Sequence, residues 1–163
     1  MVPIPPYIVE LRASYGTGRL LLPGVSAVLV REDLEPGLQH ILLTKRTDNG
    51  LWSLPAGIVE PDEQPAAALV RELLEETQVV ARAERLALLT MDPEVSYPNG
   101  DRSQYVSMCF RCSYVSGEAA VGDDESTAVG WFAVDALPAD LDEQQRRRIS
   151  CGLSDQEATV FDR

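Results

Sequence analysis

The chain has 163 residues, 45% of them hydrophobic, which is enough material for the core of a single domain spanning 1–163. Its 26 acidic residues against 14 basic ones leave a net charge of −12, which disfavours long nucleic acids and anionic membranes as partners. No apolar run is long enough to span a membrane and the N-terminus lacks the basic start of a signal peptide, so we expect a cytoplasmic protein.

The first twenty residues, 1–20, are expected to form an N-terminal arm or a helix. Residues 7–15 fit either a short helix or an extended segment, and Gly16 and Gly18 end it. The role of this segment is not readable from its composition.

Two β-rich runs, 25–30 and 38–45, are separated by a turn-like segment and predict a hairpin. A second turn at 47–50 leads through Leu51–Pro55 into the next region. The only histidine, His40, lies in the second run, where a packed or surface role is favoured. Catalysis by a Ser-His-Asp or Cys-His arrangement would depend on this one residue and is disfavoured.

The most informative stretch is GIVEPDEQPAAALVRELLEETQV, Gly57 to Val79. A helix of about three turns is predicted from Pro65, because proline suits a first helical turn and the residues that follow contain no glycine. At about 100° per residue, Glu72, Glu75 and Glu76 share one sector. The opposite, apolar face is expected to comprise Ala66, Leu69, Val70, Leu73, Leu74 and Thr77. Clustered glutamates repel one another unless a cation lies between them, so the pattern indicates a site for a hard metal ion.

Beyond this helix the sequence predicts three strands and a final helix, at 85–91, 104–115, 127–135 and 140–153. The basic run Arg146 to Arg148 in the last helix is expected to face the solvent. Cys109 and Cys112 lie three residues apart on one strand, so their side chains are expected on opposite faces of the sheet. A shared zinc ion or a redox pair is therefore disfavoured.

The spacing within the informative stretch resembles the Nudix box, GX5EX7REUXEEXGU, where U is an apolar residue. Its specified positions are occupied by Gly57, Glu63, Arg71, Glu72, Leu73, Glu75, Glu76 and Val79. The one departure is Gln78, where the motif has glycine. The preceding segment, from Val25 onward, also resembles Nudix proteins, and weaker similarities extend into the C-terminal half.

Alternation of strands with a central and a terminal helix predicts a layered α/β domain. The Nudix resemblance implies, more narrowly, an α/β/α sandwich with a mixed sheet. It also implies Mg²⁺-dependent hydrolysis, with Mn²⁺ as a second candidate ion, of a pyrophosphate bond. The expected substrate is a small nucleotide, either a nucleoside diphosphate linked to another group, such as ADP-ribose, or a nucleoside triphosphate. A homodimer is expected from the resemblance alone.

Glu72, Glu75 and Glu76 are the metal ligands that the helical pattern favours. The resemblance adds Glu63 and the backbone carbonyl of Gly57 to the metal site. It gives Arg71 an orienting ion pair with Glu63, for which a bidentate guanidinium suits better than lysine.

The general base is either one of the box glutamates or a carboxylate from the acidic segment GDDES, for which Glu125 is the candidate. For the organic part of the substrate, the candidates are Arg46, Trp52, Tyr97, Tyr105 and Arg102. Packing in the core or on the surface is the alternative for each. The alternative to an enzyme is a catalytically weak module that binds a nucleotide or a metal, and Gln78 is its only support.

Overall fold

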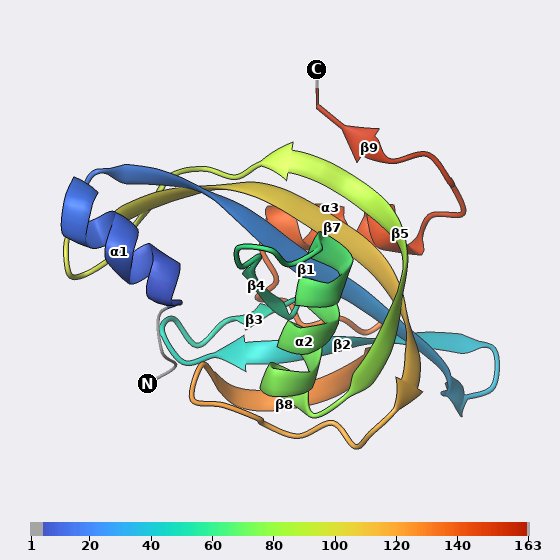
Figure 1. Ribbon diagram of the computed structural model, residues 1–163. Helices are drawn as coiled ribbons and strands as arrows, with labels where there is room; N and C mark the ends of the chain where they lie inside the picture. Colours follow the sequence, from blue (N-terminus) through green and yellow to red (C-terminus); the bar gives the residue numbers. More distant parts are fainter. Residues whose placement is uncertain (1–4, 163) are drawn as a thin grey trace.

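The computed structural model describes residues 5–162 of the chain. Within this range, three helices cover the two faces of one nine-stranded sheet (Figure 1). The helices are α1 Pro6–Tyr15, α2 Pro65–Thr77 and α3 Glu143–Leu153. The strands are β1 Arg19–Glu35, β2 Leu38–Arg46, β3 Trp52–Ser53, β4 Ala56–Ile58, β5 Val80–Met91, β6 Val95–Ser96, β7 Arg102–Ser116, β8 Ser126–Ala133 and β9 Val160–Phe161. Among these helices, none is both long and apolar enough to cross a membrane.

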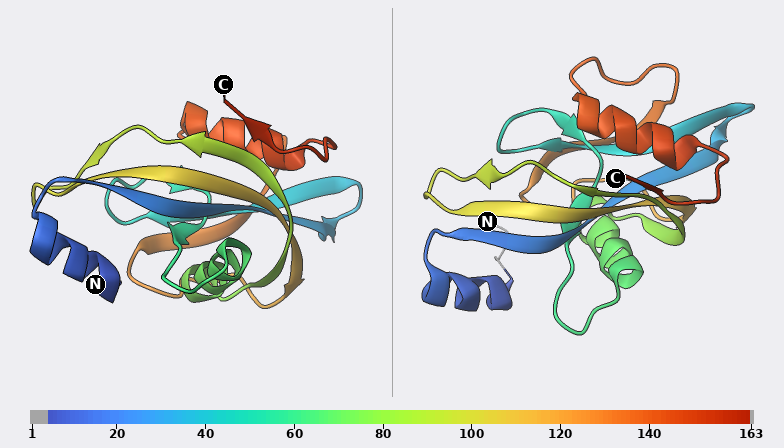
Figure 2. Two further views of the ribbon diagram at one scale, coloured as in Figure 1. Left: turned by 45° about the horizontal axis from the view of Figure 1, so that its top comes forward. Right: turned by 90° about the horizontal axis from the view of Figure 1, so that it is seen from above.

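The sheet is mixed, with the order β3-β2-β1-β7-β5-β9. The pairs β1–β7 and β5–β9 are parallel, and the other neighbours along this path are antiparallel. Strand β4 pairs with β1, β6 with β7 and β8 with β2. Helix α3 lies on one face of the sheet, and α1 and α2 lie on the other (Figure 2). The expected α/β/α sandwich with a mixed sheet is confirmed.

The predicted hairpin of runs 25–30 and 38–45 is present as β1 and β2, with Val30 opposite Ile41. Strand β1 begins earlier than predicted because it pairs in parallel with β7 from Arg19, opposite Arg102, to Val30, opposite Ser113. Such pairing joins residues far apart in sequence and has no local signal.

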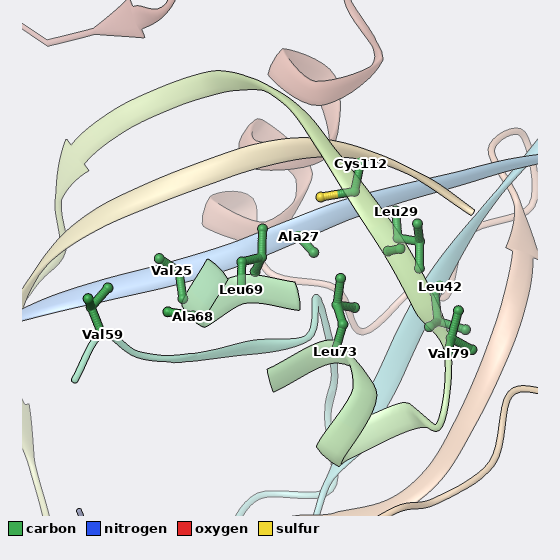
Figure 3. Packing of buried hydrophobic residues seen from close by; sticks show 11 residues of the cluster. Val25, Ala27, Leu29, Leu42, Val59, Ala68, Leu69, Leu73, Val79 and Cys112 are labelled. Atoms are coloured by element: carbon green, nitrogen blue, oxygen red, sulfur yellow. The ribbon is translucent and has the colours of Figure 1, made fainter. Parts of the chain in front are cut away.

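The middle of strand β1, residues 24–30, is buried on both faces and carries the core of the domain. Ala27 and Leu29 point toward α2 and pack in one cluster with Leu69 and Leu73 (Figure 3). The next residue along, Val28, belongs to a second cluster on the α3 side. Burial on both sides is typical of a central strand covered by helices.

The two thiols of β7 are divided between these clusters. Cys112 lies in the cluster under α2, and Cys109 lies in the cluster under α3. Both are buried and free. The prediction that their side chains lie on opposite faces is confirmed.

Helix α2 begins at Pro65, as predicted, but the predicted apolar face is wrong at two positions. Ala66 is exposed and Leu74 is 45% exposed, whereas Glu76 is only 5% exposed. The helical wheel identifies polar and apolar sides but not the strands that cover them. Strand β4 lies beside this helix and provides a backbone hydrogen bond to Glu76 from Ala56.

The expectation that Arg146 to Arg148 face the solvent is wrong for Arg148. This side chain is buried, and its Nη2 donates to Oδ1 of Asp92 at 2.6 Å. It precedes Ile149, which packs into the cluster under α3, so the helix carries Arg148 toward the sheet as well. Arg147 remains exposed and pairs with Asp162.

The N-terminal segment that the sequence left undecided is a helix. Arg12 anchors α1 by donating to the backbone oxygens of Gly18 and Arg102, at 2.6 and 2.7 Å. The Tyr7 hydroxyl donates to the backbone oxygen of Val59, which lies in the loop before α2. Helix α1 therefore contacts both the start of β7 and the loop before α2. Residues 1–4 of the predicted arm lie outside the described residues.

Candidate active site

The box begins on the short strand β4 and ends directly after α2. Strand β4 pairs with β1, with Gly57 opposite Val25, and this pairing holds the loop beside the helix. A Cβ atom added to Gly57 would lie 2.0 Å from Cδ of Glu72. The glycine is therefore required because the Glu72 carboxylate lies directly against the backbone of β4.

Arg71 is the centre of an ion-pair network. Its Nε and Nη2 donate to the two carboxylate oxygens of Glu63, each at 2.9 Å. Its Nη1 donates to Oε1 of Glu72 at 2.9 Å and to Oε2 of Glu75 at 3.2 Å. Nη2 also reaches the backbone oxygen of Ile58 at 3.3 Å. The guanidinium thus joins the helix to the loop through the bidentate pair with Glu63 and the bond to Ile58, and it also bonds to Glu72 and Glu75 on its own helix.

The bidentate pair favours the ionised state of both its members, Glu63 and Arg71. The hydrogen bond from Arg71 is the main reason why the pKa of Glu63 lies below its ordinary value. The same bond is the main reason why the pKa of Arg71 is raised. The bidentate pair is therefore a fixed feature of the loop at neutral pH.

Glu76 is buried, and Glu72, which bonds to Arg71, is partly buried. Burial raises the pKa of Glu72, although the charge of Arg71 opposes this effect. Burial also raises the pKa of Glu76 well above its ordinary value, and the negative charges of Glu72, Glu125 and Asp123 add to the rise. A proton or a cation at Glu76 relieves the cost of this arrangement.

The remaining two catalytic candidates are nearer the surface. Glu75 has 57% of its side chain exposed and makes the contact with Arg71 described above. Glu125 precedes β8, and its backbone N–H donates to Oδ1 of Asp123 at 2.9 Å. The pKa of Glu125 is raised because neighbouring groups keep water from its carboxylate, although the residue as a whole is exposed.

The donor set around Glu76 consists of carboxylate oxygens, which are the ligands that Mg²⁺ and Mn²⁺ prefer. In the described range 5–162, no three acidic, histidine or cysteine side chains are arranged as a metal cage. Two of the expected ligands, Glu72 and Glu75, are instead held by Arg71. The residues fit a divalent cation in their chemistry, because Arg71 bonds to one oxygen of each of these carboxylates and the second oxygen of each is a suitable ligand.

Comparison with known proteins assigns the chain to a family. The sequence profile of the NUDIX domain matches residues 20–151. The chain belongs to the Nudix hydrolase family. A MutT-like protein of Streptomyces ambofaciens is 36% identical over 113 residues, which cover 69% of this chain and 64% of that relative. A putative 8-oxo-dGTP diphosphatase of Bacillus subtilis is 32% identical over 127 residues, covering 76% of this chain and 80% of the relative.

A solved structure agrees with this assignment. An ADP-ribose pyrophosphatase of Streptococcus suis is similar to this Nudix fold with a TM-score of 0.62 and 25% sequence identity. The similarity covers 87% of this chain and 98% of that protein. Helix α2 is from here on called the Nudix helix.

Two of the predicted substrate-binding residues of this Nudix protein lie near the acidic residues. Arg46 ends β2 and binds Asp48 through two hydrogen bonds, at 2.9 and 2.6 Å. The bond to Asp48 is the main reason why the pKa of Arg46 is raised, and Glu125 and Tyr97 add to the rise by their proximity. The Tyr97 hydroxyl lies 2.8 Å from that of Tyr105. The fold therefore brings Arg46 and Tyr97 to the same side as Glu125.

The structure gives Trp52 and Arg102 other surroundings. The Trp52 ring packs edge-on against Phe132, with ring centroids 4.7 Å apart, beside the cluster under α3. Arg102 starts β7 near α1 and lies 3.6 Å from Glu94. Both have the packing or surface contacts that were the alternative reading for these residues.

Two residues near Glu125 escaped the sequence analysis. Thr47 donates its backbone N–H to the carbonyl oxygen of Glu125 at 2.8 Å and its hydroxyl to that of Asp124 at 2.9 Å. Gly122 donates its N–H to the carbonyl oxygen of Glu76 at 2.9 Å. Bonds to backbone oxygens across the sheet have no fixed spacing, so Thr47 had no signal. The Gly-Asp pair that includes Gly122 was a turn signal that could have drawn attention.

Gln78, the one departure from the box, ends the Nudix helix in the left-handed conformation, with φ 60° and ψ 19°. Its N–H donates to the backbone oxygen of Leu74 at 3.0 Å. The chain therefore makes the turn that glycine makes most easily, using a residue with a side chain.

Replacing Gln78 with glycine is expected to change the free energy of unfolding by about 1 kcal/mol or less, because relief of backbone strain is opposed by the greater freedom of glycine in the unfolded chain. Turnover should change by less than about threefold, since a tenfold effect requires about 1.4 kcal/mol at the transition state. Denaturant unfolding measures the change in the free energy of unfolding, and initial rates measure the change in turnover. Asp62→Gly is the matched control, because Asp62 is the second non-glycine residue with positive φ in the described range 5–162. A hundredfold gain in turnover would instead favour the binding-only alternative.

Proposed function

We propose that this protein hydrolyses the pyrophosphate bond of a nucleoside diphosphate linked to another group, in a reaction that depends on Mg²⁺. ADP-ribose or a related sugar nucleotide is the first choice of substrate, and a nucleoside triphosphate is the second. The names of the Streptococcus suis and Bacillus subtilis proteins, an ADP-ribose pyrophosphatase and a putative 8-oxo-dGTP diphosphatase, support these two classes. Three free cysteines are consistent with action in the cytoplasm.

The observation that carries this proposal is the burial of Glu76 among other carboxylates. The charges that act most on it, from Glu72, Glu125 and Asp123, are all negative. Within the described part of the chain, no basic side chain bonds to it. A buried carboxylate without a positive partner is costly in free energy, and proteins retain such groups where a cation or a proton completes the site.

Glu72, Glu75 and Glu76 are the residues that would hold the ion, with Glu63 and the backbone oxygen of Gly57 as further groups on its loop side. A bound divalent cation neutralises phosphate charge and lowers the pKa of a coordinated water. Through its bond to Glu63, Arg71 fixes the position of the loop carboxylate relative to the carboxylates of the helix. Because this bond is bidentate, it fixes the orientation of the loop as well as its distance.

Hydrolysis needs a group that removes a proton from the attacking water. Glu125 is suited to this role, because its raised pKa brings a carboxylate closer to the range of an effective base. The water oxygen forms a bond to one phosphorus atom while the bridging P–O bond breaks. The proton passes to the carboxylate, and the products are a nucleoside monophosphate and the phosphorylated remainder.

Arg46 and Tyr97 are the residues proposed to hold the rest of the substrate. Arg46 has 49% of its side chain exposed and supplies a positive charge near Glu125. The ring of Tyr97 is exposed and suited to stacking on a base. The net charge of −12 favours a small nucleotide over a long polyanion.

Glu125→Gln is expected to lower kcat by about tenfold or more with a smaller change in KM, because the amide cannot accept the proton while the shape of the loop is kept. Steady-state rates over a range of substrate concentrations measure the two constants. Glu118→Gln, an exposed glutamate of the same segment, is the control. If Asp123→Asn lowers kcat while Glu125→Gln does not, Asp123 is the base.

A substrate panel tests the proposed class of substrate. The purified protein is incubated with Mg²⁺ and ADP-ribose, a UDP-sugar, a dinucleotide or a nucleoside triphosphate, and the products are separated by ion-exchange chromatography. We expect a nucleoside monophosphate and a phosphorylated partner from at least one diphosphate-linked compound. Cleavage of the triphosphate alone, with release of pyrophosphate, would move the assignment to the second class.

A further inference from the structure

The segment Gly117 to Glu125 connects β7 to β8 and carries four acidic residues, Glu118, Asp123, Asp124 and Glu125. It is called here the acidic loop. Its path runs past the C-terminal end of the Nudix helix before it enters β8 (Figure 1). Most of its residues are exposed, so core burial contributes little to its placement. Its position therefore depends on a few specific contacts.

The first set of contacts fixes the loop to the end of the Nudix helix. The N–H of Ala120 donates to the backbone oxygen of Thr77 at 3.0 Å, and the N–H of Gly122 donates to that of Glu76 at 2.9 Å. The last carbonyls of a helix have no partners within the helix, so the loop satisfies two of them. These bonds tie the loop to the backbone of Glu76 itself.

Gly122 makes this contact because it has no side chain. A Cβ atom at this position would lie 1.9 Å from the backbone oxygen of Glu75 and 2.7 Å from Nε2 of Gln78. The first of these is a backbone atom that cannot move without disturbing the helix. A substitution by alanine must therefore push the loop away from the helix.

The second set of contacts fixes the other end of the loop to the turn after β2. Thr47 provides both bonds, through its N–H to Glu125 and its hydroxyl to Asp124. Between the two anchors, Asp123 accepts the N–H of Glu125 and shapes the loop locally. The carboxylates of Asp123 and Glu125 lie close enough to Glu76 to act on it through their charge.

We infer that Gly122 and Thr47 are positioning residues, which hold the acidic loop at its middle and at its C-terminal end so that Glu125 lies near the carboxylates of the Nudix helix. This inference rests on the proposed hydrolase function and adds the residues that position the proposed base, Glu125. Neither residue acts on the substrate. Their effect passes through Glu125, whose placement determines whether its carboxylate reaches the attacking water. Misplacement of a catalytic group by about 1 Å can cost a hundredfold in rate.

Thr47→Val removes the hydroxyl while keeping the β-branched shape and the backbone N–H, and Thr47→Ser restores the hydroxyl. We expect Thr47→Val to lower kcat by about threefold or more, and Gly122→Ala by about tenfold or more, with KM within about threefold. Thr47→Ser should keep most of the wild-type kcat. Thr127→Val is the matched control, because Thr127 also donates its hydroxyl to a backbone oxygen across the sheet, that of Lys45, outside the acidic loop.

A double-mutant cycle distinguishes positioning of Glu125 from a merely structural role of Gly122 and Thr47. If Gly122 and Thr47 act through Glu125, each substitution should lower kcat in the wild-type background and have little further effect in Glu125→Gln. Additive losses in kcat, or a Thr47→Ser variant as slow as Thr47→Val, would overturn the inference. If Gly122→Ala fails to fold, the cycle with Thr47→Val decides alone.

The same assay separates this inference from the proposed function. Wild-type hydrolysis with unchanged kcat in both positioning variants would overturn the inference and leave the function standing. A wild-type protein that cleaves no compound of the substrate panel would overturn both.

Discussion

Glu76→Gln is expected to lower turnover by at least about a hundredfold, which is the scale for loss of an electrostatic or acid–base group at a reacting centre. The side chain is nearly buried, its shape is kept by glutamine, and only its charge is lost. Initial rates with the best substrate of the panel measure the effect. Glu10→Gln, on the exposed surface of α1, is the control and should leave the rate unchanged. Full activity in Glu76→Gln would remove Glu76 from the site.

The same variant should be more stable than the wild type when no metal is present, and the difference should depend on pH. The pKa of Glu76 is raised in the folded protein from an ordinary value of 4.5, so the protonated group stabilises the fold below that value. This contribution is lost as the pH rises through the folded-state pKa. The gain in melting temperature from Glu76→Gln should therefore be small near pH 5 and larger near pH 8. A gain that is equal at both values would argue against a charged, uncompensated Glu76.

Arg71→Gln is expected to have the second largest effect, through both activity and stability. It removes the bidentate bond to Glu63 and leaves Glu72 and Glu75 without their shared counter-charge. Residues that orient metal ligands typically contribute about ten- to a hundredfold in activity. Because the arginine side chain is 30% exposed, the loss in the free energy of unfolding should be about 1 to 2 kcal/mol, below the value for a fully buried pair.

Arg71→Lys tests whether charge alone is sufficient. Lysine keeps the positive charge but cannot make the two parallel bonds to Glu63, so we expect activity closer to Arg71→Gln than to the wild type. Arg82→Lys is the matched control, because Arg82 is an exposed arginine with a single long contact, 3.5 Å, to Glu84. Wild-type rates in Arg71→Lys would show that the bidentate geometry is dispensable.

Local features of the fold were predictable from the sequence, and long-range pairing was not. Pro65 and the glycine-free run after it are sufficient to place the Nudix helix. By contrast, the parallel pairing of Ala27 with Phe110 joins residues far apart in sequence. The short strand β9 at Val160–Phe161 was missed, since two residues carry no recognisable alternation.

The acidic residues of the site were predictable, but their environments were not. Helical spacing and the Nudix resemblance identified Glu72, Glu75 and Glu76 as a group. The burial of Glu76 depends on β4 and on the acidic loop, which meet the helix only in the folded chain. The roles of Thr47 and Gly122 were hidden for the same reason, because both act through backbone atoms of distant residues.

The central claim is that the carboxylates of the Nudix helix hold a divalent cation needed to hydrolyse a pyrophosphate bond. The most direct measurement is the initial rate of ADP-ribose cleavage by the wild-type protein, from excess EDTA to saturating Mg²⁺, with AMP quantified as product. We expect no cleavage in EDTA, a saturable rise with Mg²⁺, and a loss of at least about a hundredfold at saturation in Glu76→Gln. A rate that persists in EDTA, or that is the same in Glu76→Gln, would contradict the central claim.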